Sequence, residues 1–276
     1  MENLKDVKSV LYRLFDNCGI DLSDADWLLV SVLKISRADL NKNLELKNPQ
    51  IKKIYKLAKK RVKGIPLSQI LGCVNFYGFD FYVNKHCLSP RPETELLVEQ
   101  IMQDYKAVDA GKISGLDIGT GSGAIAITLN KLANIKMTAV DISHKALRVA
   151  KKNNKALDAD VAIVKSNLFK AIGGRKFDFI VSNPPYILSA DINGLDREVK
   201  DHEPRLALDG GKDGLSYYKK IIEYAPNYLV TGGKIYFELG INQSEQVKLL
   251  LEKDFYDIVV VKDYNNIDRI IKATKK

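Results

Sequence analysis

The fold is indicated by residues 113–123, Ile-Ser-Gly-Leu-Asp-Ile-Gly-Thr-Gly-Ser-Gly, where a short apolar run leads into a glycine-rich turn. A helical stretch follows the turn, so this segment predicts a strand, a loop and a helix in succession. The alternation continues along the chain, with further strands predicted at 136–140, 161–164, 177–181, 234–239, 256–261 and 269–273. Alternating strands and helices favour an α/β fold with a doubly wound parallel sheet, and the last two strands, joined by a short turn, must be antiparallel.

The loop Gly119-Thr120-Gly121-Ser122-Gly123 is a candidate cofactor site. Glycines let the backbone turn tightly and approach a ligand closely, and the N-terminus of the following helix favours a negative group. Asp141 lies 22 residues after Gly119, at the end of the next predicted strand, where a carboxylate can accept hydrogen bonds from both hydroxyl groups of a ribose. The pattern indicates a nucleoside-containing cofactor, and these residues alone leave NAD and S-adenosylmethionine both open.

The tetrapeptide Asn183-Pro184-Pro185-Tyr186 follows the strand predicted at 177–181. Ligands of open α/β sheets bind outside the carboxyl ends of the strands, so the tetrapeptide is expected to face the cofactor. Proline lacks an N–H and holds the preceding residue extended, so this stiff loop presents two acceptors, the Asn183 side-chain oxygen and the Pro184 carbonyl. Two such acceptors suit a planar amino group conjugated to a carbonyl or a ring, with Tyr186 as an aromatic wall.

The first part of the chain has a different pattern. Residues 1–64 show apolar side chains at helical spacing, including Val10 in a first helix and Trp27 in a second helix that Ser23 would cap. Residues 74–83 are rich in β-forming side chains around Gly78, which suggests a hairpin. We therefore predict a small N-terminal helical domain at 1–72, a β-hairpin connector at 73–89 and an α/β domain at 90–276.

Composition bounds the class of protein. Of the 276 residues, 46% are hydrophobic and 28% are charged, which excludes disorder over most of the length. No window holds the roughly 18 unbroken apolar residues of a membrane helix, and the opening residues lack the pattern of a signal peptide. We therefore expect a cytoplasmic protein without a membrane partner. The three cysteines and three histidines are scattered, so neither a disulfide framework nor a metal site is expected.

The net charge of +9 is concentrated in residues 41–64, which contain nine Lys/Arg and one Glu. A solvated lysine-rich helix is the simpler interpretation of this stretch. The alternative is a docking face for an acidic partner or for RNA. Tyr55 is the only aromatic residue among these lysines, so a stacking platform for single-stranded nucleic acid is not indicated.

Asn-Pro-Pro-Tyr after the fourth strand is the signature of S-adenosylmethionine methyltransferases that act on amide or exocyclic amino nitrogens. More narrowly, the chain resembles the PrmC/HemK family of peptide chain release factor N5-glutamine methyltransferases. The resemblance covers roughly residues 60–276. The segments that carry it are Ile65–Gly72, Phe76–Val83, Pro90–Glu99, Asp117–Ala126, Asn183–Ile187, His202–Leu208, Gly210–Gly214, Gly232-Gly233 and Glu238–Gly240.

The resemblance implies a Rossmann-like class I methyltransferase that uses S-adenosyl-L-methionine to methylate the glutamine of the Gly-Gly-Gln motif in class I release factors. It also implies substrate docking for the domain at 1–72 and methyl transfer for the domain at 90–276. By family position, Gly119–Gly123, Asp141, Asn167, Leu168 and Asn183 would bind the cofactor. Asn183, Pro184, Pro185 and Tyr186 would bind the glutamine, with Asn183, Pro184 and Tyr186 counted as catalytic and Arg91 and Glu93 bordering the site. Family members usually have an aspartate and then an aromatic residue where this chain has Asn167-Leu168, although Asn167 can still accept from an adenine amino group.

Four alternatives compete with this interpretation. The same tetrapeptide serves methylation of adenine or cytosine amino groups, but no target-recognition insertion is evident, so nucleic acid is not expected as the substrate. A sister activity would methylate a glutamine of a ribosomal protein. An NAD-dependent oxidoreductase would leave Asn183 to Tyr186 without a role. A non-catalytic binding protein on the same fold is disfavoured because every expected polar group is present.

Overall fold

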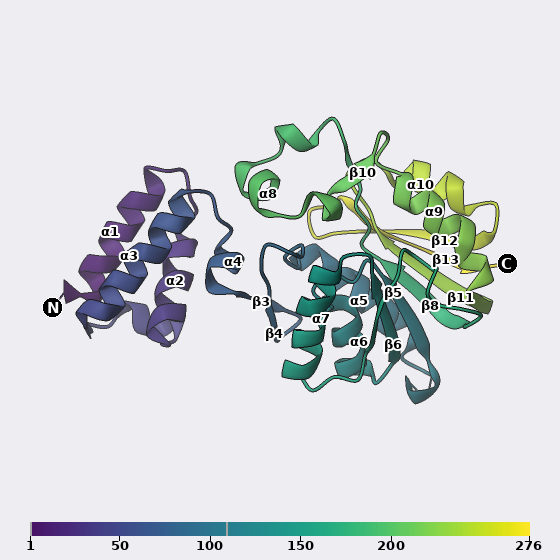
Figure 1. Ribbon diagram of the computed structural model, residues 1–276, viewed down its shortest axis with the longest axis horizontal. Coiled ribbons are helices and arrows are strands. Elements are labelled where there is room, and N and C mark those ends of the chain that lie inside the picture. Colours follow the sequence, from purple (N-terminus) through teal and green to yellow (C-terminus); the bar gives the residue numbers. More distant parts are fainter. Residues whose placement is uncertain (1, 109) are drawn as a thin grey trace. The chain divides into compact units, whose positions relative to one another are not determined.

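The computed structural model describes residues 2–108 and 110–276 (Figure 1). The chain divides into two compact units, Met1–Cys73 with Asp196–His202, and Val74–Leu195 with Glu203–Lys276. The first unit is mainly helical, and the second contains the large sheet. The chain therefore passes between the units three times, and a short segment far along the sequence belongs with the N-terminal helices.

The second unit is built on a seven-stranded sheet of order β12-β13-β11-β8-β5-β6-β7. Neighbouring strands from β11 to β7 are parallel, while β13 is antiparallel to both β11 and β12. This confirms the predicted doubly wound sheet with its antiparallel closing pair. The strands are β5 (Ser114–Ile118), β6 (Lys136–Asp141), β7 (Ala162–Lys165), β8 (Phe177–Ser182), β11 (Leu229–Glu238), β12 (Phe255–Lys262) and β13 (Asp268–Lys275).

Strand β11 starts earlier than the sequence predicts. The strand was predicted at 234–239, with Gly232-Gly233 read as the turn that leads into it, but this pair lies within β11. The register between β11 and β8 shifts between Leu229 and Lys234, and Gly232 has a φ of +71°. A glycine in this left-handed conformation bends the strand locally, so the pair makes an irregularity in the strand and not its beginning.

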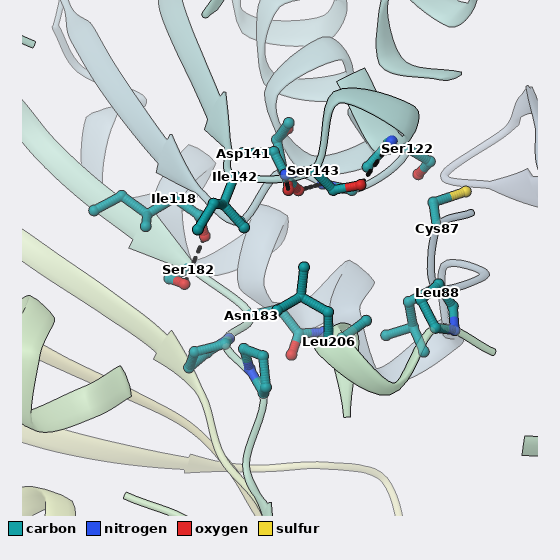
Figure 2. Close-up of a pocket in the computed structure, with 18 of the residues that line it drawn as sticks. Cys87, Leu88, Ile118, Ser122, Asp141, Ile142, Ser143, Ser182, Asn183 and Leu206 are labelled. Atoms are coloured by element: carbon teal, nitrogen blue, oxygen red, sulfur yellow. Dashed lines mark hydrogen bonds between the residues drawn. The ribbon is translucent and has the colours of Figure 1, made fainter. Parts of the chain in front are cut away.

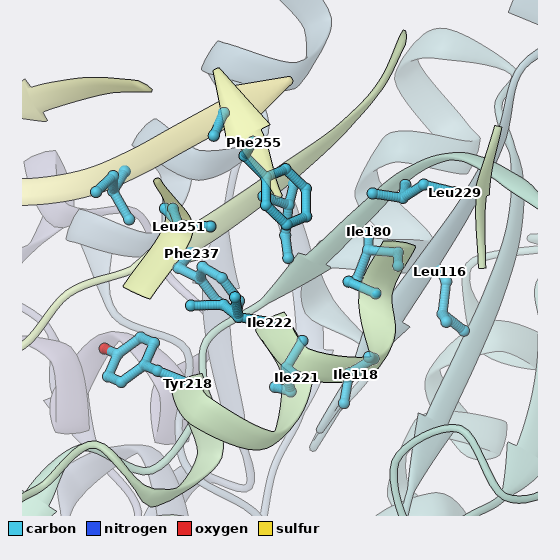
Figure 3. Packing of buried hydrophobic residues seen from close by; sticks show 14 of the residues in the cluster. Leu116, Ile118, Ile180, Tyr218, Ile221, Ile222, Leu229, Phe237, Leu251 and Phe255 are labelled. Atoms are coloured by element: carbon cyan, nitrogen blue, oxygen red, sulfur yellow. The ribbon is translucent and has the colours of Figure 1, made fainter. Parts of the chain in front are cut away.

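Two hydrophobic clusters cover the two faces of the sheet. One includes side chains of α9 (Ser216–Tyr224) and α10 (Ser244–Leu251), and Figure 3 shows Ile221, Ile222 and Leu251 packed with strand residues. The other includes side chains of α5 (Pro92–Tyr105) and α6 (Ala124–Ala133). Because side chains alternate along a strand, Phe237 and its neighbour Tyr236 on β11 belong to different clusters.

A short hairpin precedes α5. Its strands, β3 (Cys73–Phe76) and β4 (Phe79–Tyr82), are joined by Tyr77 and Gly78, with φ of +52° and +82°. Positive φ at both central residues is the requirement of the tight turn that suits a twisted hairpin. Asn153 of α7 (His144–Ala156) holds β4 in place, because its side chain accepts from the backbone N–H of Tyr82 and donates to the carbonyl of the same residue.

The first unit contains α1 (Leu4–Asp16), α2 (Ser23–Leu33), α3 (Asn48–Val62), α4 (Leu67–Leu71), η1 (Arg37–Asn41), the short pair β1 (Glu2–Asn3) and β2 (Glu45–Leu46), and α8 (Arg197–His202). Two side chains tie α8 to the N-terminal helices. Arg61 lies 2.5 Å from an oxygen of Asp24 and 2.7 Å from an oxygen of Glu198. The Gln69 amide donates to the His202 carbonyl at 2.8 Å.

Val10 and Trp27 lie in α1 and α2, as predicted, and they are 39% and 47% exposed. The buried residues of α2 are Ala25, Leu28 and Leu29, and the guanidinium of Arg37 lies 5.1 Å from the centre of the Trp27 ring. One detail was predicted wrongly, because Ser23 is not the cap of α2. Its backbone N–H donates to the Asp21 carboxylate, so Asp21 supplies the acceptor at this helix start.

The remaining elements are short. They are β9 (Ile187–Leu188) and β10 (Asp209–Gly211), which pair in parallel, and the 3-10 helices η2 (Ala110–Lys112), η3 (Ile192–Gly194), η4 (Arg205–Ala207) and η5 (Ala225–Asn227). Across residues 2–108 and 110–276, no helix has the length and apolar character needed to cross a membrane.

Candidate active site

A cavity of about 360 Å³ lies at the carboxyl ends of the parallel strands. Figure 2 shows how Asp141 at the end of β6, Ile142 and Ser143 after it, Asn183 after β8, and Leu206 surround the cavity. The predicted site residues that line it are Arg91, Gly119, Thr120, Gly121, Ser122, Asp141, Asn167, Leu168, Asn183, Pro184 and Pro185. Glu93, Gly123 and Tyr186 are not among the lining residues. The sheet topology therefore brings segments from 91 to 185 to one place.

The glycine loop joins β5 to α6. The backbone N–H groups of Gly119 and Thr120 both donate to the Val140 carbonyl, at 2.9 and 3.0 Å, which fastens the loop to the end of β6. Gly119 has a φ of +75°, and nothing lies within 4 Å of the position that a β-carbon would take there. The positive φ of Gly119 favours glycine at this position. Gly119 lines the cavity, and the space beside its α-carbon is unfilled.

Asp141 connects this loop to the start of α7. One carboxylate oxygen accepts from the Gly121 N–H at 2.9 Å, and the other accepts from the Ser143 N–H at 2.8 Å. Ser143 in turn caps α7, because its hydroxyl accepts from the Ala146 N–H. Burial raises the pKa of Asp141, and the backbone donors oppose that rise. Each carboxylate oxygen keeps a second lone pair, so both hydroxyl groups of a ribose can still be accepted.

Asp117 supports the loop from within the sheet. It is 1% exposed, and one of its carboxylate oxygens accepts from the Thr120 hydroxyl at 2.6 Å. Burial raises the pKa of Asp117 to about 7. Asp117 does not itself line the cavity, so its direct effect is on the conformation of Thr120.

The Asn183 side chain has a defined orientation. Its amide nitrogen donates to Oε2 of Glu238 at 2.8 Å and to the Thr94 hydroxyl at 3.3 Å. With the nitrogen engaged in this way, the amide oxygen is the atom left to accept a hydrogen bond. Within the part of the chain that the structure describes, no donor is bonded to the neighbouring Pro184 carbonyl. The two acceptors expected from the sequence are therefore both available beside the cavity.

Tyr186 has a different environment from the one expected of a cavity wall. It packs against the hydrophobic cluster of α9 and α10, and its carbonyl accepts from the Gln243 amide at 3.0 Å. Burial raises the pKa of its phenol. Gly210 makes this packing possible, because a β-carbon at that position would lie 2.7 Å from the Tyr186 α-carbon.

Arg91 and Glu93 stand at the start of α5. Arg91 is the N-cap residue and lines the cavity, and its guanidinium lies 2.8 Å from the carboxylate of Glu203. The Glu203 side chain is 1% exposed, whereas that of Arg91 is 44% exposed, so the pair anchors Arg91 at the edge of the cavity. Glu93 lies in the first turn of α5, where its negative charge interacts favourably with the helix dipole.

Thr94 and Glu238 were not predicted as site residues from the sequence. Both are buried, and they meet at Asn183. The signal for Glu238 was a single acidic residue within the otherwise apolar run 235–239, on the strand next to the one that leads to Asn183. Thr94 had no comparable signal, because its partners lie 89 and 144 positions away in the sequence.

The residues present fit S-adenosyl-L-methionine. The glycine loop offers a cradle that a β-carbon at Gly119 would partly fill, and Asp141 provides acceptors for a ribose beside it. The cavity volume lies within the range of sites for small ligands and cofactors, roughly 300–1,000 Å³. Among the described residues, no group of three or more His, Cys, Asp or Glu side chains is arranged to hold a metal ion.

Comparison with known proteins identifies similar chains. Residues 13–72 match the family model of the PrmC N-terminal domain, and residues 92–196 match that of the methyltransferase small domain. A release factor glutamine methyltransferase of Bacillus cereus is 41% identical over 265 residues, which cover 92% of this chain and 93% of the relative. One of Geobacter sulfurreducens is 40% identical over 252 residues, covering 90% and 87%.

A solved structure of similar fold is a methyltransferase from Pyrococcus furiosus. It superposes with a TM-score of 0.55 at 23% sequence identity and covers 72% of this chain and 90% of its own. This likeness concerns the fold, and it agrees with the class I methyltransferase sheet described above.

Proposed function

This chain belongs to the release factor glutamine methyltransferase family, and from that premise we propose that it methylates the glutamine of the Gly-Gly-Gln motif in class I peptide chain release factors. The methyl acceptor is the side-chain amide nitrogen, N5, and the cofactor is S-adenosyl-L-methionine. The observation that carries the proposal is the orientation of Asn183, whose nitrogen is held by Glu238 while its oxygen is left to accept.

S-adenosyl-L-methionine supplies an electrophilic methyl group on a sulfonium sulfur. We assign its binding to the loop Gly119–Gly123 and to Asp141, because the loop is open on the cavity side and the carboxylate is held by two backbone donors. Asn167 and Leu168, which also line the cavity, would border the adenine.

The chemical difficulty lies in the amide nitrogen, whose lone pair is delocalised into the carbonyl. Asn183 Oδ1 and the Pro184 carbonyl can each accept one N–H of the substrate amide, which favours a geometry that frees the lone pair. The same two oxygens stabilise the positive charge that develops on nitrogen as the new N–C bond forms. Holding the amide in place supplies further acceleration through proximity and orientation.

No strong base is required after the transfer. A methylated nitrogen that carries a positive charge beside a carbonyl is acidic enough to lose its proton to water. The stiff Pro184-Pro185 backbone keeps the two acceptors in place throughout, because proline fixes φ and cannot donate from its nitrogen. This division of labour explains why acceptors, and not a general base, are gathered at the nitrogen.

We further propose that the predicted domain at 1–72 docks the release factor, with 73–89 as connector and 90–276 as catalytic domain. Support comes from α3, which has no acidic residue and has exposed lysines at 52, 53, 56, 59 and 60. Like charges at i,i+4 destabilise an isolated helix, and an anionic partner bound to this exposed basic face would relieve their repulsion. Charge reversal at Lys52 and Lys56 should raise KM for the release factor and leave kcat unchanged, whereas an unchanged KM would contradict docking.

We propose the cytoplasm as the place of action, since the protein substrate works in translation. The activity itself is tested with methyl-labelled S-adenosyl-L-methionine and a purified release factor, comparing the native Gly-Gly-Gln loop with a glutamine-to-alanine variant. Label on the native protein alone supports the proposal. Label that appears on a ribosomal protein or on nucleic acid, and on neither release factor, overturns the substrate and keeps the cofactor.

The enzyme residue to change first is Asn183. Asn183→Ala should lower transfer by at least about 100-fold, because one of the two acceptors is lost from the transition state. The Kd of S-adenosyl-L-methionine, measured by equilibrium dialysis, should change little. Asn265→Ala is the matched control, since it makes the same change in an exposed residue outside the cavity. Turnover retained in Asn183→Ala contradicts the mechanism.

A further inference from the structure

Three polar side chains from distant parts of the chain meet behind the cavity. Oε2 of Glu238, at the end of β11, accepts from the Thr94 hydroxyl at 2.6 Å and from the Asn183 amide at 2.8 Å. Glu238 and Thr94 are 2% and 3% exposed, and only Thr94 and Asn183 line the cavity. Glu238 therefore cannot touch a bound ligand directly, but it touches a residue that can.

We propose that Glu238 is a positioning residue of the methyl-transfer site, which holds Nδ2 of Asn183 so that Oδ1 is the atom presented to the substrate amide, with Thr94 as the second donor to the same carboxylate oxygen. This inference rests on the proposed function, because it explains how the acceptor in that mechanism is selected.

The selection matters because the two ends of an asparagine amide have nearly the same shape and opposite hydrogen-bonding character. Turned over, Asn183 would offer N–H groups to a substrate nitrogen that also carries N–H groups, and no bond would form. A carboxylate oxygen only accepts, so it bonds the nitrogen end and not the oxygen end. Oε2 already accepts from two donors, the Thr94 hydroxyl and the Asn183 amide. A proton on the carboxyl group would therefore sit on the other oxygen, and Oε2 would remain an acceptor.

The sheet fixes the relation between the two residues. Strands β8 and β11 are parallel neighbours, with Ser182 opposite Phe237. Asn183 and Glu238 are the next residues along the two strands, so they emerge side by side at the carboxyl edge. Thr94 enters from the first turn of α5, which follows the segment containing Arg91. The hydrogen bonds of Glu238 therefore connect the start of α5 to the loop 183–186.

The position of Glu238 is costly for the fold, which favours a functional reason for it. A buried carboxylate loses its hydration, and burial accordingly raises the pKa of Glu238 to about 7. An apolar side chain would complete the surrounding core, where Phe237 and Leu239 are fully buried, without that cost. Unfavourable buried polar groups of this kind cluster at sites where they set a geometry.

The proposal is tested with full-length Glu238→Gln, which keeps the shape and removes the charge, and with Thr94→Val. Glu223→Gln, an exposed residue of α9, is the matched control. At saturating concentrations of both substrates, Glu238→Gln should lower kcat roughly 10- to 100-fold, because misplacement of one group by a fraction of an ångström is enough for such a loss. The Kd of S-adenosyl-L-methionine should stay within about twofold, since Glu238 does not line the cavity.

A second measurement needs no turnover. The side-chain NH2 signal of Asn183 in a ¹H–¹⁵N spectrum is assigned by its absence in Asn183→Asp. It should move and exchange faster with solvent in Glu238→Gln than in Glu223→Gln. If the wild-type enzyme labels no release factor but this signal still depends on Glu238, the proposed function has failed and the positioning inference stands for whichever substrate is labelled.

Two results would overturn the positioning role. One is an unchanged kcat in Glu238→Gln together with an unchanged Asn183 signal. The other is a loss of kcat that is matched by an equal loss of cofactor binding and a lower thermal midpoint, because that combination describes a general disturbance of the fold. Loss of kcat with an intact fold and intact cofactor binding supports the inference.

Discussion

The buried carboxyl of Glu238 gives the fold a measurable pH dependence. Its pKa is raised from 4.5 to about 7, chiefly by burial. The hydrogen bond from Thr94, the charge of Arg269 and the hydrogen bond from Asn183 oppose the rise, and Glu93 adds to it. Between these two pKa values the folded state binds more protons than the unfolded state, so stability falls as pH rises. The contribution is fully present below 4.5 and is lost as pH rises through about 7.

The magnitude follows from the width of that interval. Each pH unit corresponds to about 1.4 kcal/mol, so the whole contribution is about 3 kcal/mol, of which about 2 kcal/mol is lost between pH 5.5 and pH 8. Glu238→Gln removes this titration. From pH 5.5 to pH 8 the wild type should therefore lose about 2 kcal/mol of unfolding free energy more than the variant does. Asp117, whose pKa is also raised to about 7, titrates in both proteins and cancels.

The assay is urea unfolding at several pH values, followed by far-ultraviolet circular dichroism. The chain has one tryptophan, Trp27, which lies in the N-terminal helical unit, so its fluorescence reports that unit separately. The fluorescence transition should be the same in both proteins at every pH, which makes it an internal control. Parallel pH dependences of the wild type and Glu238→Gln from 5.5 to 8 would refute the raised pKa of the Glu238 carboxyl.

Three further outcomes are expected. Gly123→Ala should lower the unfolding free energy by about 1–2 kcal/mol more than Gly173→Ala. Both glycines have positive φ, but only at Gly123 would the new β-carbon lie 2.8 Å from the Ile127 side chain. Equal losses of stability in urea unfolding would contradict this. Asp141→Asn should weaken S-adenosyl-L-methionine binding in calorimetry by about tenfold or more, since an N–H replaces one of its acceptor oxygens, and an unchanged Kd would remove Asp141 from the site. Arg61→Met should destabilise the helical unit by roughly 2 kcal/mol, because it leaves two partly buried carboxylates unpaired. A Trp27 fluorescence transition at the wild-type urea concentration would argue against that role.

Much of the fold could be predicted from the sequence because its signals are local. Apolar runs marked every strand of the central sheet to within a few residues, apart from the early start of β11. That start was missed because Gly232-Gly233 has the local sequence of a turn, whereas the strand begins at Leu229, which pairs with Phe177 of β8. Periodicity also placed Trp27 correctly in α2, but it could not show that this side chain stays exposed, because that depends on which side of the helix meets the other helices.

The sequence by itself determined the chemistry available to the site: the glycine loop, the carboxylate after the second strand and the two acceptors at Asn183 and Pro184. These depend on residue type and on short spacings, which no tertiary contact alters. Only the tertiary structure decided which end of the Asn183 amide is available, because its partners Glu238 and Thr94 lie 55 and 89 positions away. Strand order and helix packing bring those side chains together, and neither is a local property of the chain.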